Sequence, residues 1–271
     1  MKQISTFILV TILVMGLVVG VAHAERLVIE GSTTVLPIAQ RAAEEFMARN
    51  KDADISVRGG GSGVGITSLI AGTCDIANSS RPIKDSELEK AISRGKEPKA
   101  HVIAMDGIAV IVNSANPITG LSKQQLKDIY TGKISYWSEV GGPSEKIVVV
   151  SRDSASGTFE AFGDLALDKQ KVRKDALMEA SNQAVASVVA KTPGAIGYVG
   201  LAYIGKGVKA IEIDGVMPTK STVVSKKYRL SRPLFMYTNG KPTGLAKEFI
   251  DFILSPEGQK LVDEEGYVSI K

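Results

Sequence analysis

Cysteine and histidine are almost absent from this sequence of 271 residues, which has one cysteine and two histidines. The single cysteine, Cys74, excludes a disulfide within the chain and any metal site built from several cysteines. His101 is the only histidine after residue 24, and no Gly-x-Ser-x-Gly motif accompanies it, so a Ser-His-Asp hydrolase has little support. Ser93 and Lys96 have Ser-x-x-Lys spacing, but the companion motifs of penicillin-interactive enzymes are missing. We therefore expect no catalytic residue, no metal and no cofactor.

A strong excess of charge of one sign is also missing. The 33 Lys and Arg residues are interspersed with 29 Asp and Glu residues, which gives a net charge of +4 at neutral pH. Without a basic block, the chain lacks the charge pattern of a nucleic-acid-binding protein, and we expect no nucleic acid as a partner. A weak and diffuse positive charge agrees with attraction for small anions.

Residues 1–24 have the pattern of a signal peptide. Lys2 supplies a positive charge, residues 8–21 are almost unbroken in their apolar character, and Ala22-His23-Ala24 fits the small-x-small pattern that precedes cleavage. The apolar run is shorter than the ~20 residues of a membrane-spanning helix. We predict cleavage after Ala24 and export to the periplasm, with an uncleaved N-terminal anchor as the alternative.

The rest of the chain alternates between strand and helix patterns. Residues 27–29 form a short β-type run, and the apolar positions between 36 and 47 recur with the period of a helix. The same order of strand, polar turn and helix then repeats around residues 55–70 and 75–82. This order predicts an α/β fold with a largely parallel sheet, and no flexible linker or internal repeat interrupts it.

Four segments share a composition rich in Ser, Thr and Gly, and each follows a predicted strand: residues 31–34, 59–63, 78–81 and 152–158. Ligands of open α/β sheets bind beyond the carboxyl ends of the strands, where helix N-termini offer free N–H groups. Each segment alone is more typical of a helix cap or a turn. Together, with two arginines, they predict a cage of donors for an oxyanion. The candidate ligands are Ser32, Thr33, Thr34, Ser62, Ser80, Arg81, Arg152, Ser156, Gly157 and Thr158.

The ordered set of motifs resembles the phosphate-binding proteins of phosphate ABC transporters. It consists of Gly31-Ser32-Thr33-Thr34, Gly61-Ser62-Gly63, the segment from Asp75 to Pro82, Ser154-Ala155-Ser156-Gly157-Thr158, the stretch 126–142 with Trp137, Gly194-Ala195-Ile196-Gly197-Tyr198 and Arg232-Pro233-Leu234. The resemblance covers essentially the whole chain after residue 24. It implies a type II periplasmic-binding fold, in which two α/β lobes are joined by crossing hinge strands and the ligand lies in the cleft between them.

The same resemblance implies the division of the chain and its partners. Residues 25–107 with 225–271 would form lobe one, and residues 108–224 would form lobe two. The family's ligand positions correspond here to Thr33, Thr34, Ser62, Arg152, Ser156, Gly157 and Thr158. The expected partners are inorganic phosphate and the membrane permease subunits of an ABC transporter, with the binding protein itself a monomer.

The third polar turn departs from the family pattern, because the best-known members have an aspartate where this chain has Ser80, followed by Arg81. A carboxylate can accept the proton of hydrogen phosphate, so its loss bears on selectivity. The acceptor would then be a hydroxyl, a backbone carbonyl or another carboxylate such as Asp153. Binding of tungstate, molybdate or sulfate is the first alternative. An exported phosphate-ester hydrolase, and a sensor or adhesive module with the same fold, are the others.

Overall fold

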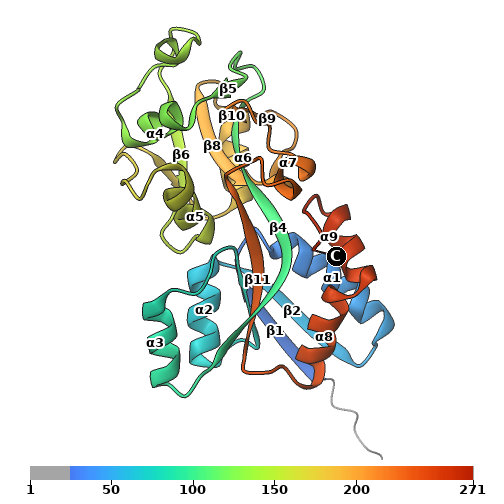
Figure 1. Ribbon diagram of the computed structural model, residues 1–271. Coiled ribbons are helices and arrows are strands. Elements are labelled where there is room, and N and C mark those ends of the chain that lie inside the picture. Colours follow the sequence, from blue (N-terminus) through green and yellow to red (C-terminus); the bar gives the residue numbers. More distant parts are fainter. Residues whose placement is uncertain (1–24, 271) are drawn as a thin grey trace, which may run out of the picture.

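The computed structural model describes residues 25–270, so the predicted signal peptide lies outside the described residues. Two α/β lobes are joined by two long strands that run side by side through the middle of the molecule (Figure 1). These strands are β4 (Pro98–Asn113) and β11 (Ser231–Asn239), and they pair antiparallel. The α/β class and the two-lobed arrangement of the predicted type II fold are confirmed.

Lobe one contains both ends of the described chain. Its elements are β1 (Glu25–Gly31), α1 (Leu36–Arg49), β2 (Ala53–Gly59), α2 (Ser62–Ala71), β3 (Ile76–Ser79), α3 (Asp85–Ser93), α8 (Gly244–Leu254) and α9 (Pro256–Glu264). Strand β1 pairs in parallel with β2 and β3, and β3 pairs antiparallel with β11. The carboxyl ends of β1, β2 and β3 therefore lie at one edge of this sheet.

Lobe two holds the middle of the chain. Its strands are β5 (Gly120–Leu121), β6 (Val148–Arg152), β7 (Leu177–Glu179), β8 (Ala195–Gly200), β9 (Val208–Ala210) and β10 (Glu212–Ile213). Its helices are α4 (Lys123–Thr131), α5 (Gly157–Ala166), α6 (Asn182–Lys191), α7 (Lys220–Val224) and the 3-10 turns at Trp137–Val140 and Leu201–Tyr203. Strand β6 runs parallel to β7 and β8. The fourth polar turn, residues 152–158, follows its carboxyl end.

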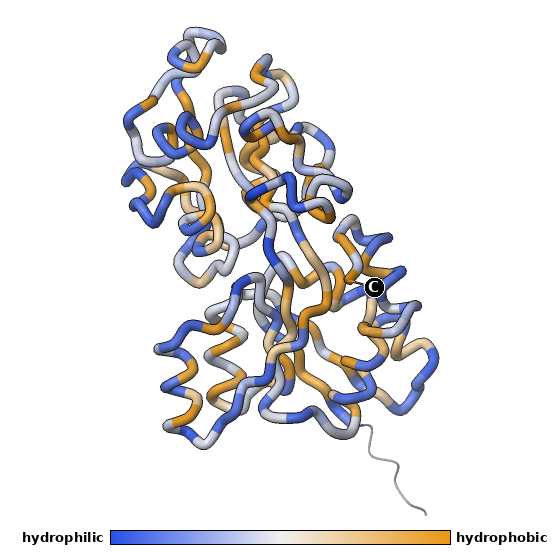
Figure 2. Tube along the Cα trace, in the orientation of Figure 1, coloured by the Kyte–Doolittle hydropathy of each residue, from blue (hydrophilic) through white to orange (hydrophobic). Residues whose placement is uncertain are grey.

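Each lobe has its own hydrophobic core, and strand β4 contributes to both. Its residues Ile103 and Ala104 pack in the core of lobe one, whereas residues 108–112 pack in the core of lobe two. Apolar residues gather along the strands and the inner helix faces in Figure 2. Tyr228 and Leu230 pack in the second core although they follow position 224, where we predicted the return to lobe one.

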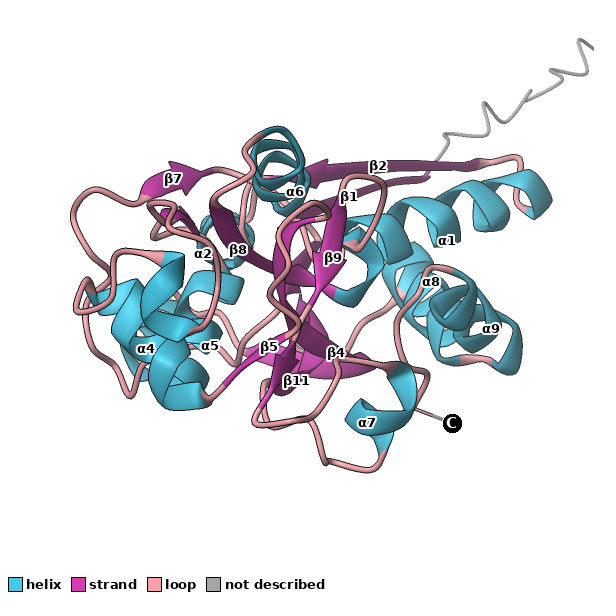
Figure 3. Cartoon of the chain, turned by 90° about the horizontal axis from the view of Figure 1, so that it is seen from above, coloured by secondary structure: helices cyan, strands magenta, loops and turns pink. Residues whose placement is uncertain are grey.

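The helices form separate groups on the two lobes. Viewed from above, α1, α8 and α9 lie together at one side of the molecule and α4 and α5 at the other (Figure 3). Within residues 25–270, no helix has the length and apolar character needed to span a bilayer. Trp137 is fully buried and donates its indole N–H to the Gly194 carbonyl, so it is a packing anchor of lobe two.

Candidate functional site: a buried polar seam between the lobes

The candidate site is the seam between the lobes, where the turns after β1, β2, β3 and β6 meet. The N–H of Gly63 in lobe one donates to the carbonyl of Ala155 in lobe two at 3.0 Å. The hydroxyl oxygens of Thr34 and Thr158, also from opposite lobes, are 2.9 Å apart. In Figure 1 this seam lies between α5 and α2. The predicted convergence of the polar turns is therefore present, and the lobes are in direct contact there.

All ten residues predicted for the site are buried. They are Ser32, Thr33, Thr34, Ser62, Ser80, Arg81, Arg152, Ser156, Gly157 and Thr158. Buried hydroxyl and guanidinium groups are costly unless they are hydrogen-bonded. Such a concentration of them, in a protein with two separate apolar cores, marks a site that serves more than packing.

Ser62 and Ser80 join the second and third turns of lobe one. The backbone N–H of Ser80 donates to Ser62 Oγ at 3.0 Å, and the two hydroxyl oxygens are 3.4 Å apart. Because Ser62 Oγ already accepts one hydrogen bond, its own proton is directed elsewhere. Gly157 of lobe two approaches so closely that a β-carbon on it would lie 2.3 Å from Ser62 Oγ and 2.8 Å from Ser80 Oγ. A side chain at position 157 is incompatible with this contact.

Two of the predicted ligands also act as caps of local structure. Ser156 Oγ accepts the N–H of Phe159 at 3.2 Å and begins α5, and Ser32 Oγ accepts the N–H of Thr34 at the same distance. The predicted capping and ligand roles are thus compatible, since a hydroxyl that accepts a hydrogen bond keeps its proton to donate. The start of α5 also directs free N–H groups and the positive end of the helix dipole toward the seam.

Arg152 is held at the end of β6 with one nitrogen left over. Its Nε donates to the Glu179 carbonyl at 3.0 Å and its Nη2 to the Ala180 carbonyl at 2.9 Å. Among residues 25–270, Nη1 has no hydrogen-bond partner, although the side chain is only 1% exposed. Burial lowers the pKa of Arg152 from its ordinary value. The guanidinium is therefore a fixed, desolvated cation with a donor available.

Arg81 has a different environment from the one predicted for it. Its guanidinium forms ion pairs at 2.7 Å with Glu87 of α3 and with Glu160 of α5, and Lys84 pairs with Glu160 at 2.8 Å. Burial alone would lower the pKa of Arg81, but the two carboxylates outweigh it and the pKa is raised. The arginine's charge is thus neutralised, and it links the lobes at the rim of a groove of about 930 Å³ that both lobes line.

Asn182, at the start of α6, is a buried residue of the seam that was not predicted. Its Nδ2 donates to the hydroxyl oxygens of Thr33 and Thr34, at 3.0 and 3.1 Å, from the opposite lobe. Its Oδ1 accepts the N–H of Gly200 at 3.1 Å. The residue lies outside the four Gly- and Ser-rich turns, and only its place after the capping residue Ser181 set it apart in the sequence.

A buried ion pair on the crossing strands was also missed. Arg232 of β11 and Asp106 of β4 are directly opposite each other, and Arg232 Nη2 lies 3.2 Å from Asp106 Oδ2. Arg232 also donates to Thr158 Oγ1 at 2.8 Å and to the Gly157 carbonyl at 3.2 Å. Burial lowers the pKa of Arg232 against the influence of Asp106. A single carboxylate inside the apolar run of β4 was the available signal for this pair.

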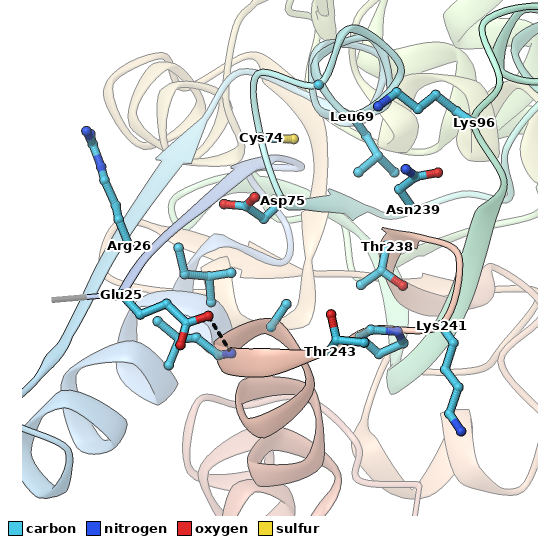
Figure 4. Close-up of a pocket in the computed structure, with 15 residues that line it drawn as sticks. Glu25, Arg26, Leu69, Cys74, Asp75, Lys96, Thr238, Asn239, Lys241 and Thr243 are labelled. Atoms are coloured by element: carbon cyan, nitrogen blue, oxygen red, sulfur yellow. Dashed lines mark hydrogen bonds between the residues drawn. The ribbon is translucent and has the colours of Figure 1, made fainter. Parts of the chain in front are cut away.

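The pocket in Figure 4 lies at the other end of the lobe-one sheet, beside the amino end of β1. Its Glu25 carboxylate accepts the N–H of Leu245 at the start of α8, and its Asp75 carboxylate accepts the N–H of Val28. Burial raises the pKa of Cys74 to about 12, so this buried thiol is a poor nucleophile. The polar groups here serve local structure, and ligands of such sheets bind at the opposite, carboxyl ends.

Two α/β lobes that enclose buried donors between them define a solute-binding protein. A model of the PBP superfamily domain matches residues 20–257. The chain is 39% identical over 249 residues to the phosphate-binding protein PstS of Bacillus subtilis. This alignment covers 90% of this chain and 80% of that protein. The chain belongs to the PBP superfamily and, within it, to the family of the PstS phosphate-binding proteins.

Solved structures agree with this membership. A chain from Clostridium perfringens, assigned to a phosphate ABC transporter as its substrate-binding protein and solved with bound phosphate, has a TM-score of 0.85 and 35% identity. The alignment covers 91% of this chain and all of that one. An ABC-type phosphate transport receptor from Vibrio cholerae has a TM-score of 0.73 and 34% identity, with 89% of this chain and 99% of that chain covered.

Proposed function

We propose that this protein is the phosphate-binding component of an ABC importer, which captures inorganic phosphate in the seam and delivers it to a membrane permease. The observation that carries the proposal is the seam itself, where desolvated hydroxyls, helix N–H groups and the available Nη1 of Arg152 come together from both lobes. Relatives named as phosphate-binding proteins, one of them solved with phosphate, support the choice of ligand.

The proposal includes where the protein acts and how the chain divides. It is exported to the periplasm, with residues 1–24 removed as a signal peptide, and works as a monomer. Lobe one is formed by residues 25–107 and the C-terminal part, and lobe two by the middle of the chain. Because Tyr228 and Leu230 belong to the second core, the return crossing is better taken at the start of β11 than at position 224.

In this proposal the two lobes supply complementary donors. Lobe one contributes Thr33, Thr34, Ser62 and Ser80, which follow the carboxyl ends of its parallel strands. Lobe two contributes Arg152 and the start of α5, where Ser156, Gly157 and Thr158 offer hydroxyl and backbone N–H donors. Charge-assisted bonds of this kind, made away from water, hold an oxyanion strongly without reacting with it.

Arg81 is not a direct ligand in this proposal, although its position in the third turn first indicated that role. Its cationic charge is matched by Glu87 and Glu160, and the charge of Arg232 is matched by Asp106. Among residues 25–270, Arg152 is then the arginine of the seam that forms no ion pair with a carboxylate. One unpaired cation suits a small anion whose remaining charge is spread over hydrogen bonds from neutral donors.

The proposal predicts that Arg152→Ala weakens phosphate binding by about 100-fold, because a hydrogen-bonded charge in a desolvated site is lost. Isothermal titration calorimetry with inorganic phosphate measures this. Arg173→Ala is the matched control, since Arg173 lies in the same lobe and pairs with Asp175 at the surface. Unchanged affinity in Arg152→Ala would reject the site.

The identity of the anion is tested separately with unmodified protein. A thermal-shift panel compares phosphate with sulfate, molybdate and tungstate, because a ligand that binds the folded state raises its melting temperature by mass action. We expect phosphate to give the largest shift at equal concentration. A larger shift with one of the other anions would assign the protein to that anion and keep the seam as the site.

A further inference from the structure

The orientation of the Asn182 side-chain amide is determined by its contacts. The backbone N–H of Gly200 can only donate, so the atom of Asn182 that faces it at 3.1 Å must be the acceptor Oδ1. The other atom, Nδ2, therefore carries both hydrogens. It lies 3.0 Å from Thr33 Oγ1 and 3.1 Å from Thr34 Oγ1, so each hydrogen has a hydroxyl oxygen to bind.

This arrangement makes Asn182 a bridge between the lobes and sets the direction of hydrogen bonding at the two threonines. Asn182 begins α6 in lobe two, whereas Thr33 and Thr34 follow β1 in lobe one. An amide N–H cannot accept a proton, so each threonine oxygen has to accept from Asn182. The proton of each hydroxyl must then be donated to some other group.

The donor direction at Thr34 also determines the donor direction at Thr158. Thr34 Oγ1 accepts from Asn182 Nδ2 and lies 3.4 Å from Arg232 Nη2, and we assign its own proton to Thr158 Oγ1, 2.9 Å away. Thr158 Oγ1 also accepts from Arg232 Nη2 at 2.8 Å. In this assignment both acceptor positions of Thr158 are occupied, and its proton points out of the network.

We propose that Asn182 is a positioning residue that makes the hydroxyl of Thr33 and, through Thr34, the hydroxyl of Thr158 donors toward the bound oxyanion. The inference rests on the proposed function and adds to it a specificity determinant outside the predicted ligand turns. Asn182 does not touch the anion in this scheme. It acts through Thr33 and Thr34, and Arg232 supports the same direction at Thr158.

The isosteric variant Asn182→Asp tests the direction of the hydrogen bonds. At pH 8 the introduced carboxylate still accepts the Gly200 N–H but can no longer donate to Thr33 or Thr34, whose protons would turn toward it. We expect phosphate affinity, measured by calorimetry, to fall about 100-fold. Asn182→Ala removes the donor without adding an acceptor, so the hydroxyls remain free to rotate toward the anion, and we expect a loss of about 10-fold.

The pH profile separates this role from a purely structural one. A buried carboxyl group has a raised pKa, so lowering the pH from 8 to 5 protonates the introduced group and restores a donor. The ratio of phosphate affinities between the unmodified protein and Asn182→Asp should therefore fall by roughly 10-fold between pH 8 and pH 5. Phosphate itself changes protonation over this range, so the unmodified protein is measured at each pH as the reference. A gap that does not change with pH, or an Asn182→Ala variant as weak as Asn182→Asp, would overturn the proposal.

Two further variants complete the test. Gln183→Glu adds the same charge at the next, exposed position of α6 and should bind phosphate as the unmodified protein does. Thr34→Val keeps the shape of the side chain but removes its hydroxyl, so it should weaken phosphate binding, whereas Thr34→Ser keeps the hydroxyl and should not. Tight phosphate binding by Thr34→Val would overturn the proposal, and this test holds even if Asn182→Asp fails to fold. If the unmodified protein does not bind phosphate, the proposed function fails, which is distinct from failure of these variants.

Discussion

Gly157 shows how much the seam depends on a single residue. Replacement by alanine would place a methyl group 2.3 Å from Ser62 Oγ, closer than any real contact. Relieving such an overlap costs ~1–3 kcal/mol, so we expect Gly157→Ala to bind phosphate roughly 5- to 150-fold more weakly in calorimetric titration.

Gly163→Ala is the control for this prediction. Position 163 lies in the same helix, α5, and a β-carbon there meets no atom within 4 Å. Its phosphate affinity should match that of the unmodified protein. Equal affinities for Gly157→Ala and Gly163→Ala would mean that the contact between Gly157 and Ser62 is not made in the bound state.

Among single residues, the site candidates that could be predicted are those marked by the composition of their immediate neighbours in the sequence. Ser62, Gly157 and Thr158 belong to short polar turns after strands, and the sequence alone shows both the turn and the strand. Arg81 has the same kind of local signal, but its partner Glu160 is distant in sequence and only the fold brings the two together. Asn182 has no composition signal, because its importance comes from contacts with the opposite lobe.

Among the elements, α5 and the turn before α3 are tied together by Glu160. This residue of lobe two pairs with Arg81 and Lys84 of lobe one. Glu160→Gln should therefore weaken the closed arrangement and lower phosphate affinity about 5-fold, as expected for the loss of ~1 kcal/mol from an ion-pair network that reaches the surface at Lys84. Stopped-flow measurement of phosphate release should show that the change lies in a faster dissociation rate.

Asp164→Asn, one turn further along α5 and exposed, is the control for Glu160→Gln. It removes the same charge from the same helix and should leave the release rate unchanged. A Glu160→Gln variant that also releases phosphate at the normal rate would show that the ion pairs do not contribute to closure.

Glu87 gives this network a defined pH dependence. Burial alone would raise the pKa of Glu87, but hydrogen bonds from Arg81 and the Lys84 N–H hold it below its ordinary value of 4.5. A depressed pKa stabilises the folded state above pH 4.5, and this contribution is lost as the pH falls through the lower folded value. The melting temperatures of Glu87→Gln and unmodified protein should thus differ at pH 7, and the difference should shrink as the pH falls below 4.5.

The order of elements could be predicted from the sequence because each strand and helix has its own periodicity. The alternation of β1, α1, β2 and α2 follows from patterns within a few residues of each element. The position of the return crossing is not encoded locally, since it depends on Tyr228 and Leu230 packing in a core whose members extend back to Ile108. Pairing of β11 with both β3 and β4 is likewise a long-range property.

For the whole molecule, phosphate should stabilise both lobes together, because its proposed ligands are divided between them. At a phosphate concentration 100 times the dissociation constant, mass action adds about 2.7 kcal/mol, which corresponds to roughly 5–11 °C in melting temperature for a chain of this size. Differential scanning calorimetry measures this shift. Since β4 belongs to both cores, we expect one transition with and without phosphate. Two separate transitions, with phosphate shifting only one of them, would confine the ligand's contacts to a single lobe and contradict binding in the seam.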